Sequence, residues 1–305
     1  MDYNANRKKQ LAALKNTRAT SHSGGNFLQH LFGVFDILRA WGAPEEVYLA
    51  GLYHSIYGTE FFQKSTVDKQ QRQSIQALIG VPAERLAYAF CSVRRNEILP
   101  ALLNCSLPEQ HSRATLNEIN SHNTLQLTAL ELEQLLLIEM ANLLDQLSDK
   151  DRSPAIFIWR LVEMAESISF LPPQHPALLS QGLRKTDEIK ALEAYKQALT
   201  ISQPDNAKTH LKKAIGLNPI IGESYILLAA IELDSERFDS ALYLASEGLQ
   251  HLRTWASPWD KRLLLSDWMS LAERLIELAC IGVRGEGFWQ RLQKMLTNSH
   301  MRRCS

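Results

Sequence analysis

The stretch that decides the fold runs from residue 26 to residue 41 and reads NFLQHLFGVFDILRAW. Its apolar face recurs at i, i+4, i+7, i+8 and i+11, through His30, Val34, Ile37, Leu38 and Trp41. This spacing is typical of one side of an amphipathic α-helix. The segment before it, residues 23–26, supplies flexible backbone and capping side chains. We therefore predict a helix at about 26–41.

Helical periodicity continues on both sides of the next break. Gly42-Ala43-Pro44 ends the first helix, and a proline suits the first turn of the following one. That second helix is expected to run to about Ser55, with His54 on the same side as Ala50 and Gly51. Because no run alternates in the manner of a strand, we predict an all-α fold. Further helices are expected at about 68–79, 83–93, 124–147 and 155–168, and the polar segment 100–123 is either a lid or a surface loop.

A proline-rich segment divides the chain. Residues 170–176 read FLPPQHP, and three prolines within five residues cannot continue a helix. A chain of 305 residues is comfortable for two domains. We predict a first domain of residues 1–171 and a second of residues 172–305.

Composition narrows the classes of partner. Lys plus Arg equals Asp plus Glu at 33 each, so no global field attracts nucleic acid or an anionic membrane. The N-terminal residues lack the apolar run of a secretory signal, and no stretch approaches the roughly 20 apolar residues of a membrane span. Four scattered cysteines without Cys-x-x-Cys spacing suit a reducing compartment. We expect a cytoplasmic protein that binds a small molecule or another protein, and neither nucleic acid nor membrane.

Three histidines near the N-terminus carry the strongest chemical signal. His30 and His54 fall on the inner faces of two consecutive helices, and His22 lies in a flexible segment that can reach over the same place. A single histidine of this kind is more often a hydrogen-bonded core residue than a ligand. Two that point into one interior predict a metal site, because neutral imidazole is a common metal ligand.

The pattern around these histidines resembles the HD superfamily. Residues 50–60 read AGLYHSIYGTE, which is similar to the small-apolar run and His-Asp pair of that family, and His30 matches its earlier histidine. The step Met140-Ala141-Asn142 resembles the Ala-Asp step that supplies the family's last ligand. The resemblance implies a helical phosphohydrolase domain with His30, His54 and Asn142 as metal ligands. Ser55 and Asn142 stand where the family has aspartates, which removes the bridge of a dinuclear centre.

Nearby carboxylates offer compensation for those lost charges. Glu139 and Asp145 lie three residues on either side of Asn142, so one of them can share its helical face. Glu60 follows His54 closely enough to project from the same turn. A site with one divalent metal per chain, iron, manganese or zinc, would suit this set. The alternative is a metal-free core in which Asn142 and Ser55 hydrogen-bond the two histidines.

Residues from His22 to about Cys91 are also similar to an uncharacterised HD-like branch in which His-Ser replaces His-Asp. That similarity supplies no activity, and fold analogy does not add one. Arg94, next to Arg95 at a helix end, is a candidate for binding phosphate or carboxylate. A cation at a helix C-terminus is also favourable without any ligand.

The second domain resembles tetratricopeptide repeats. The clearest unit begins at Tyr225, turns at Phe238 and places the small residues Ala241 and Gly248 at close packing points of its second helix. A partial unit precedes it, and a helix at about 259–279 is a plausible cap. The resemblance implies protein contact or self-association through the repeats. A generic helical bundle is the alternative.

Two hypotheses about function follow. The first is a metal-dependent enzyme with a divergent HD-like site that performs oxidation or phosphoester hydrolysis, its candidate catalytic residues being His22, Ser55, Glu60 and Arg94. The second is a catalytically silent HD-like module that binds a small molecule or a protein and is joined to a protein-interaction repeat domain.

Overall fold

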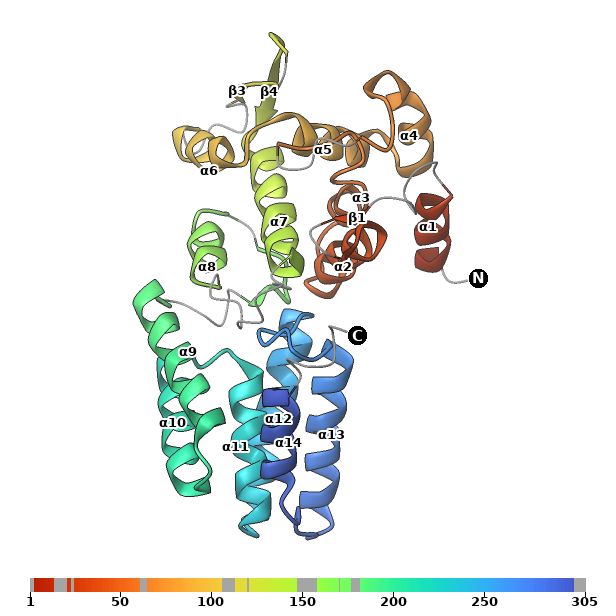
Figure 1. Cartoon of the computed structure of the whole chain (residues 1–305). Helices are drawn as coiled ribbons and strands as arrows, with labels where there is room; N and C mark the ends of the chain where they lie inside the picture. Colours follow the sequence, from red (N-terminus) through yellow and green to blue (C-terminus); the bar gives the residue numbers. More distant parts are fainter. Residues whose placement is uncertain are drawn as a thin grey trace. The chain divides into compact units, whose positions relative to one another are not determined.

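The computed structural model describes residues 3–13, 21–22, 25–60, 65–105, 113–119, 121–146, 158–169, 171–176 and 182–298. Helices dominate, and the all-α class is confirmed (Figure 1). The chain forms two compact units. Unit 1 comprises Met1–Gln146 and Glu163–Gln174, and unit 2 comprises Leu147–Val162 and His175–Ser305. The division between Gln174 and His175 falls within the proline-rich segment.

Unit 1 is built around a core of four helices that pack against one another: α2, α3, α5 and α7. Leu31, Val34 and Leu38 of α2 are fully buried, as the periodicity of residues 26–41 predicts. The helices of unit 1 are α1 (Tyr3–Ala12), α2 (Phe27–Ala40), α3 (Glu45–Leu52), the 3-10 turn η1 (Lys69–Gln71), α4 (Arg72–Ile79), α5 (Val81–Ser92), α6 (Arg95–Asn104) and α7 (Ala129–Gln146). Helix α8 (Ile158–Glu166) begins in unit 2 and ends in unit 1.

Short strands accompany the helices, although the sequence shows no convincing alternating pattern. In the described part of unit 1, β3 (Arg113–Asn117) pairs antiparallel with β4 (Thr124–Thr128), and the two-residue strands β1 (Ser21–His22) and β2 (Gly25–Asn26) form a second pair. Leu116 and Leu127 are buried while their neighbours along each strand are more exposed, which is the two-residue period of a half-buried hairpin. Because each strand has only one buried leucine, the two-residue period is too short to be recognised in the sequence.

Helix α7 begins at Ala129 and not at about 124. Thr128 and Glu131 cap its start reciprocally: the Glu131 amide donates to Thr128 Oγ1 at 3.1 Å, and the Thr128 amide donates to Glu131 Oε2 at 2.8 Å. This arrangement is a capping box, which halts the helix at its first residue and releases the preceding residues to the strand.

Two further boundaries differ from the predictions. The segment expected to be a loop from residue 100 is helical as far as Asn104, because α6 continues through Pro100.

Helix α3 ends at Leu52, so His54 lies in a turn beyond it. The imidazole of His54 explains this ending: its Nδ1 contacts the Gly51 carbonyl at 2.7 Å, and a continuing helix would have offered that carbonyl to the amide of residue 55.

Unit 2 consists of helices that pack in sequence order. Helix α9 (Lys185–Thr200) packs on α10 (Pro204–Leu217), α11 (Gly222–Asp234) on α12 (Phe238–Trp255), and α12 on α13 (Leu265–Cys280), while α14 (Phe288–Asn298) contacts α11 and α9. Gly248 lies where α12 approaches α11 most closely, since a Cβ there would stand 2.8 Å from the Gly222 carbonyl oxygen. The helix expected from about 259 begins only at Leu265, because the buried side chain of Asp260 binds Tyr195 and Arg262 and holds the preceding residues in a turn.

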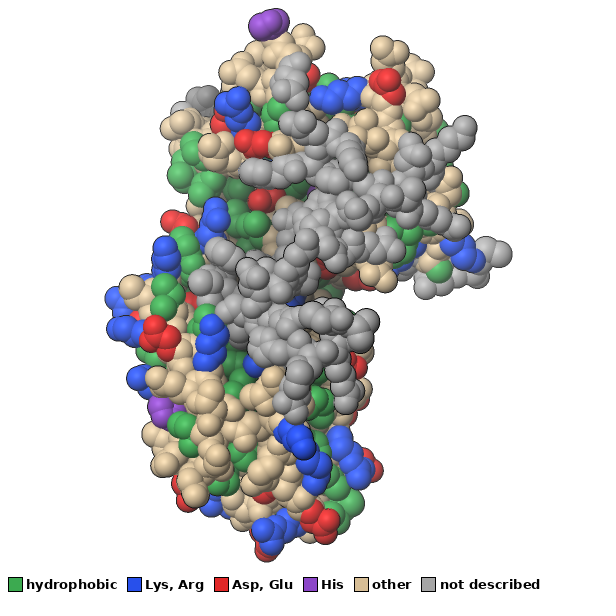
Figure 2. Space-filling view, in the orientation of Figure 1, with side chains coloured by type: hydrophobic (Ala, Val, Ile, Leu, Met, Phe, Trp, Pro, Cys, Tyr) green, Lys and Arg blue, Asp and Glu red, His purple; other side chains and the backbone are tan. Residues whose placement is uncertain are grey.

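Charges of both signs are interspersed over the described surface drawn in Figure 2, in keeping with their equal totals. Among the described residues, none of the helices has the length and apolar character that crossing a bilayer requires.

Candidate metal centre

Three residues of unit 1 bring nitrogen and oxygen atoms to one point. His30 comes from α2, His54 from the turn after α3, and Asn142 from α7. The Nε2 atom of His30 lies 3.2 Å from His54 Nε2 and 3.1 Å from Asn142 Oδ1. His54 and Asn142 are buried, and the His30 side chain is only 9% exposed. The residues predicted as ligands are therefore neighbours in the fold, although 112 positions separate His30 from Asn142.

Each of these three side chains has a second polar atom, and the hydrogen bond made by that atom fixes the orientation of the side chain. His54 Nδ1 donates to the Gly51 carbonyl at 2.7 Å, so in the neutral ring Nε2 is an acceptor. Asp145 Oδ2 lies 2.6 Å from His30 Nδ1 and makes His30 Nε2 an acceptor in the same way. Asn142 Nδ2 donates to Glu139 Oε2 at 3.1 Å, which turns the amide oxygen toward His30. Three acceptor atoms thus face one another when both rings are neutral.

The residues of α7 reach the histidines because of helical spacing. Glu139, Asn142 and Asp145 follow one another at intervals of three, and such residues share a face. The Asp145 carboxylate lies directly against the backbone of α2 at Gly33. A Cβ on Gly33 would stand 1.9 Å from Asp145 Oδ1, so a larger residue at position 33 would displace the carboxylate from its present place.

A buried arginine holds Glu139, the carboxylate that accepts from the Asn142 amide. Arg95, the first residue of α6, pairs through Nε with Glu139 Oε2 at 3.2 Å and lies over the Phe90 ring, with its guanidinium carbon 3.4 Å from the ring centre. Its NH1 group also donates to the Phe90 carbonyl. Burial is the largest influence on the pKa of Arg95 and lowers it, while the charge of Glu139 acts in the opposite direction. Arg95 therefore anchors Glu139, and Glu139 anchors Asn142.

A cysteine supports the turn that carries His54. The Cys91 thiol donates to the His54 carbonyl at 3.1 Å. Burial raises the pKa of this thiol to about 11, so at neutral pH Cys91 is protonated and serves as neither nucleophile nor ligand.

The spacing of the inner atoms fits the ligands of a single cation. Bonds of about 2.0–2.1 Å from zinc to imidazole nitrogen, with donor atoms 3.1–3.2 Å apart, correspond to ligand–metal–ligand angles of roughly 100°. The carboxylates are placed behind the inner side chains, on His30 Nδ1 and on the Asn142 amide, where they orient ligands. Within the described residues no group of three or more His, Cys, Asp and Glu side chains is arranged to hold a metal.

Other residues predicted for the site lie elsewhere or outside the described side chains. Arg94 is 60% exposed and pairs with Glu97 at 3.8 Å, away from the histidines. Glu60 accepts from the Arg95 amide at 3.4 Å. Ser55 is buried in the turn after His54, and its backbone carbonyl accepts from Gly58. The backbone of His22 is in β1, but its side chain lies outside the described part of the chain.

Sequence reasoning missed the roles of Arg95 and Gly33. The sequence shows Arg95 only as the neighbour of Arg94, and Arg94, which is exposed, was predicted to be the binding residue. Gly33 carried a weak signal, since a glycine one turn after a buried histidine within a helix costs stability unless something needs the space.

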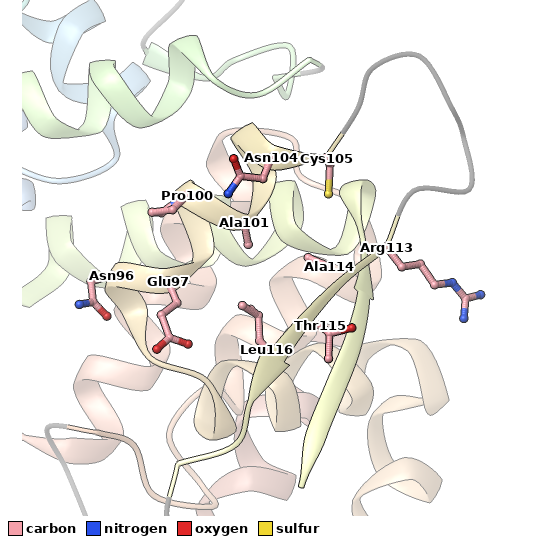
Figure 3. A pocket seen from close by; sticks show the side chains of 10 residues that line it. All are labelled: Asn96, Glu97, Pro100, Ala101, Asn104, Cys105, Arg113, Ala114, Thr115 and Leu116. Carbon is pink, nitrogen blue, oxygen red and sulfur yellow. The ribbon is translucent and has the colours of Figure 1, made fainter. Parts of the chain in front are cut away.

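Two cavities of unit 1 lie apart from the histidines. One of about 610 Å³ is lined by α6 and β3 (Figure 3). Another of about 410 Å³ lies beside the turn between β3 and β4. Neither is lined by His30, His54 or Asn142.

Comparison with known families yields one match. Residues 11–95 match a family described as a domain of unknown function (DUF6817). The match covers less than a third of the chain, and it includes His30, His54 and Arg95 but not Asn142 or Asp145. No curated protein and no solved structure matches the chain.

Proposed function

We propose that unit 1 is a metal-dependent hydrolytic enzyme that holds one divalent cation through His30, His54 and Asn142. The observation that carries this proposal is the approach of His54 Nε2 and Asn142 Oδ1 to His30 Nε2, at 3.2 Å and 3.1 Å, with each of the three side chains held by a hydrogen bond through its other polar atom. Acceptor atoms so close together repel one another unless a positive charge lies among them.

Outer partners of this kind are a property of metal sites. A ligating histidine normally donates its second N–H to a carboxylate or a backbone carbonyl, which fixes the ring and raises its basicity. His30 uses the carboxylate of Asp145 for this purpose, and His54 uses the Gly51 carbonyl. The resemblance of residues 50–60 to the HD superfamily supports the same ligands.

The charge of the ligand set favours hydrolysis over oxidation. Two neutral imidazoles and one neutral amide leave the full charge of a divalent cation uncompensated in the inner layer. A cation held in this way is a strong Lewis acid and lowers the pKa of a bound water. Asp145 and Glu139 supply negative charge only from the outer layer. Phosphoester hydrolysis is the reaction class that the HD resemblance implies.

We further propose that unit 2 serves protein contact. The pairwise packing of α9 with α10 and of α11 with α12 supports a helical-repeat arrangement. Helix α14 covers α9 and α11, and Asp234 binds three amides at its start, those of Gly287, Phe288 and Trp289. A partner would therefore use the faces of α10, α12 and α13.

Elemental analysis of the full chain, purified without an affinity metal, tests the proposal for unit 1. We expect close to one zinc, iron or manganese per chain, and near-complete loss in His30→Ala and in His54→Ala. His122→Ala, an exposed histidine of the same unit, is the matched control and should retain the metal. Circular dichroism of each variant separates loss of a ligand from loss of the fold. Full metal content in both site variants would refute the assignment.

The alternative is a catalytically silent binding module. It is favoured by the fact that one proton can replace the cation: a doubly protonated His30 would donate to Asp145 through Nδ1 and to Asn142 or His54 through Nε2. In this case the chain would bind no metal after reconstitution with zinc, iron or manganese. The same variants would then chiefly lower the free energy of unfolding, by about 1–3 kcal/mol.

A further inference from the structure

The outer edge of β3 differs from the outer edge of β4 in its hydrogen bonding. The Glu118 amide donates to the Asn123 carbonyl at 2.9 Å, which continues the register of the hairpin. Because hydrogen-bonded and non-hydrogen-bonded pairs alternate in an antiparallel ladder, the pair Thr115–Gln126 is non-hydrogen-bonded. The N–H and C=O groups of Thr115 and Gln126 therefore point away from the hairpin, toward its two opposite edges.

On the β4 side, backbone groups that point away from the hairpin form hydrogen bonds with side chains of neighbouring helices. Arg85 of α5 donates to the Gln126 carbonyl at 2.8 Å, and Glu131 of α7 accepts from the Thr128 amide at 2.8 Å. On the β3 side, no hydrogen bond with any described residue uses the outward N–H or C=O of Thr115. Such an edge is a template for another strand unless it is blocked.

A groove runs along this open edge. The cavity of about 610 Å³ lies between β3 and α6, and Leu116 extends from the strand into the space below Ala101 and Pro100 (Figure 3). A second cavity, of about 410 Å³, is lined by Asn117 and residues of the hairpin turn, and Glu97 lines both cavities. The five residues of β3 extend for about 17 Å, which matches a short peptide strand.

Charges in the groove define what a guest strand should carry. Glu97 lines both cavities, and its side chain is 33% exposed. Arg113 lies at the far end of the first cavity, and its guanidinium group points away from α6 (Figure 3). A guest would meet an apolar floor at Leu116 and Ala101 and, beside it, the carboxylate of Glu97, which pairs with Arg94 at 3.8 Å.

We propose that the groove between α6 and β3 binds an extended segment of another polypeptide, which pairs with the outer edge of β3 as an added strand. The guest carries a lysine or arginine that faces Glu97 and small or apolar side chains beside it. Main-chain hydrogen bonds to Thr115 supply the pairing, and alternate side chains enter the groove. This site is separate from the histidines and does not depend on metal binding.

Selection of random nine-residue peptides displayed on phage against the full chain supplies a probe, and fluorescence anisotropy of the synthesised peptide measures its affinity. Thr115→Pro removes the outward N–H without removing a ladder bond, since proline is tolerated at such edge positions. Gln126→Pro is the matched control, because residues 115 and 126 form one register pair and the control removes the outward N–H on the opposite edge.

We expect peptides with a central basic residue, weakened about tenfold or more by Thr115→Pro and by less than about twofold by Gln126→Pro. Glu97→Lys should weaken them as well, and N-methylation on the pairing edge of the peptide should abolish binding. The proposal is overturned if no peptide binds below about 1 mM, or if Thr115→Pro and Gln126→Pro bind alike. Sedimentation that shows a dimer of the free chain, lost in Thr115→Pro, would also overturn it by assigning the edge to a second copy.

Discussion

Glu223 of unit 2 gives the sharpest prediction about pH and stability. It lies in the first turn of α11, is 1% exposed, and accepts from the Asp260 amide at 3.1 Å. Burial is the largest influence on its carboxyl group, and the negative charge of Asp260 acts in the same direction. Together they raise the pKa of Glu223 from 4.5 to about 7, against the opposing effect of backbone hydrogen bonds.

The sign of the effect follows from proton binding. The folded chain holds the Glu223 proton more tightly than the unfolded chain does, so the free energy of unfolding falls as pH rises from about 4.5 to about 7. At about 1.36 kcal/mol for each pH unit, this raised pKa corresponds to roughly 3 kcal/mol of lost stability above pH 7. Glu223→Gln keeps an acceptor oxygen for the Asp260 amide and removes the ionisation.

Urea unfolding of the full chain, followed by tryptophan fluorescence, measures this difference. Unit 2 contains five of the six tryptophans, so the signal reports chiefly on that unit. The E223Q variant should gain about 3 kcal/mol relative to the unsubstituted chain between pH 4.5 and pH 8, because pH effects from other groups cancel in the comparison. Glu273→Gln, which breaks only an exposed ion pair with Arg253, should change stability by less than about 0.5 kcal/mol at either pH. A pH-independent difference between E223Q and the unsubstituted chain would show that folding does not raise the pKa of Glu223.

Two further predictions concern the candidate metal centre and the packing of unit 2. Asp145→Asn should weaken metal binding by about 10–100-fold in a chelator-competition titration, and Gly33→Ala should have the same effect by displacing the carboxylate; unchanged affinity in both would remove Asp145 from the site. Gly248→Ala should lower the free energy of unfolding by about 1–3 kcal/mol in thermal denaturation, because its Cβ would stand 2.7 Å from Ile226 Cγ1. In contrast, Gly216→Ala in α10 places its Cβ in open space and should be neutral or stabilising, so equal losses in the two variants would contradict the packing argument.

The amino-acid sequence by itself determined the helical class of the fold and the position and buried face of α2. The apolar period of residues 26–41 predicted α2 to within one residue at each end and placed His30 on its inner side. Local spacing also predicted that Glu139 or Asp145 shares the helical face of Asn142. Such predictions succeed because helical periodicity depends only on residues within a few turns of one another.

Tertiary structure alone decided which groups on those faces meet. Asp145 contacts His30 across 115 positions, and Arg95 rather than Arg94 turns inward to hold Glu139. The end of α3 was also decided by competition, since the His54 imidazole takes the Gly51 carbonyl that the next helical turn would have used. A periodic pattern specifies that a side chain is buried but not the distant atom that satisfies it, because that partner is set by the packing of helices far apart in the chain.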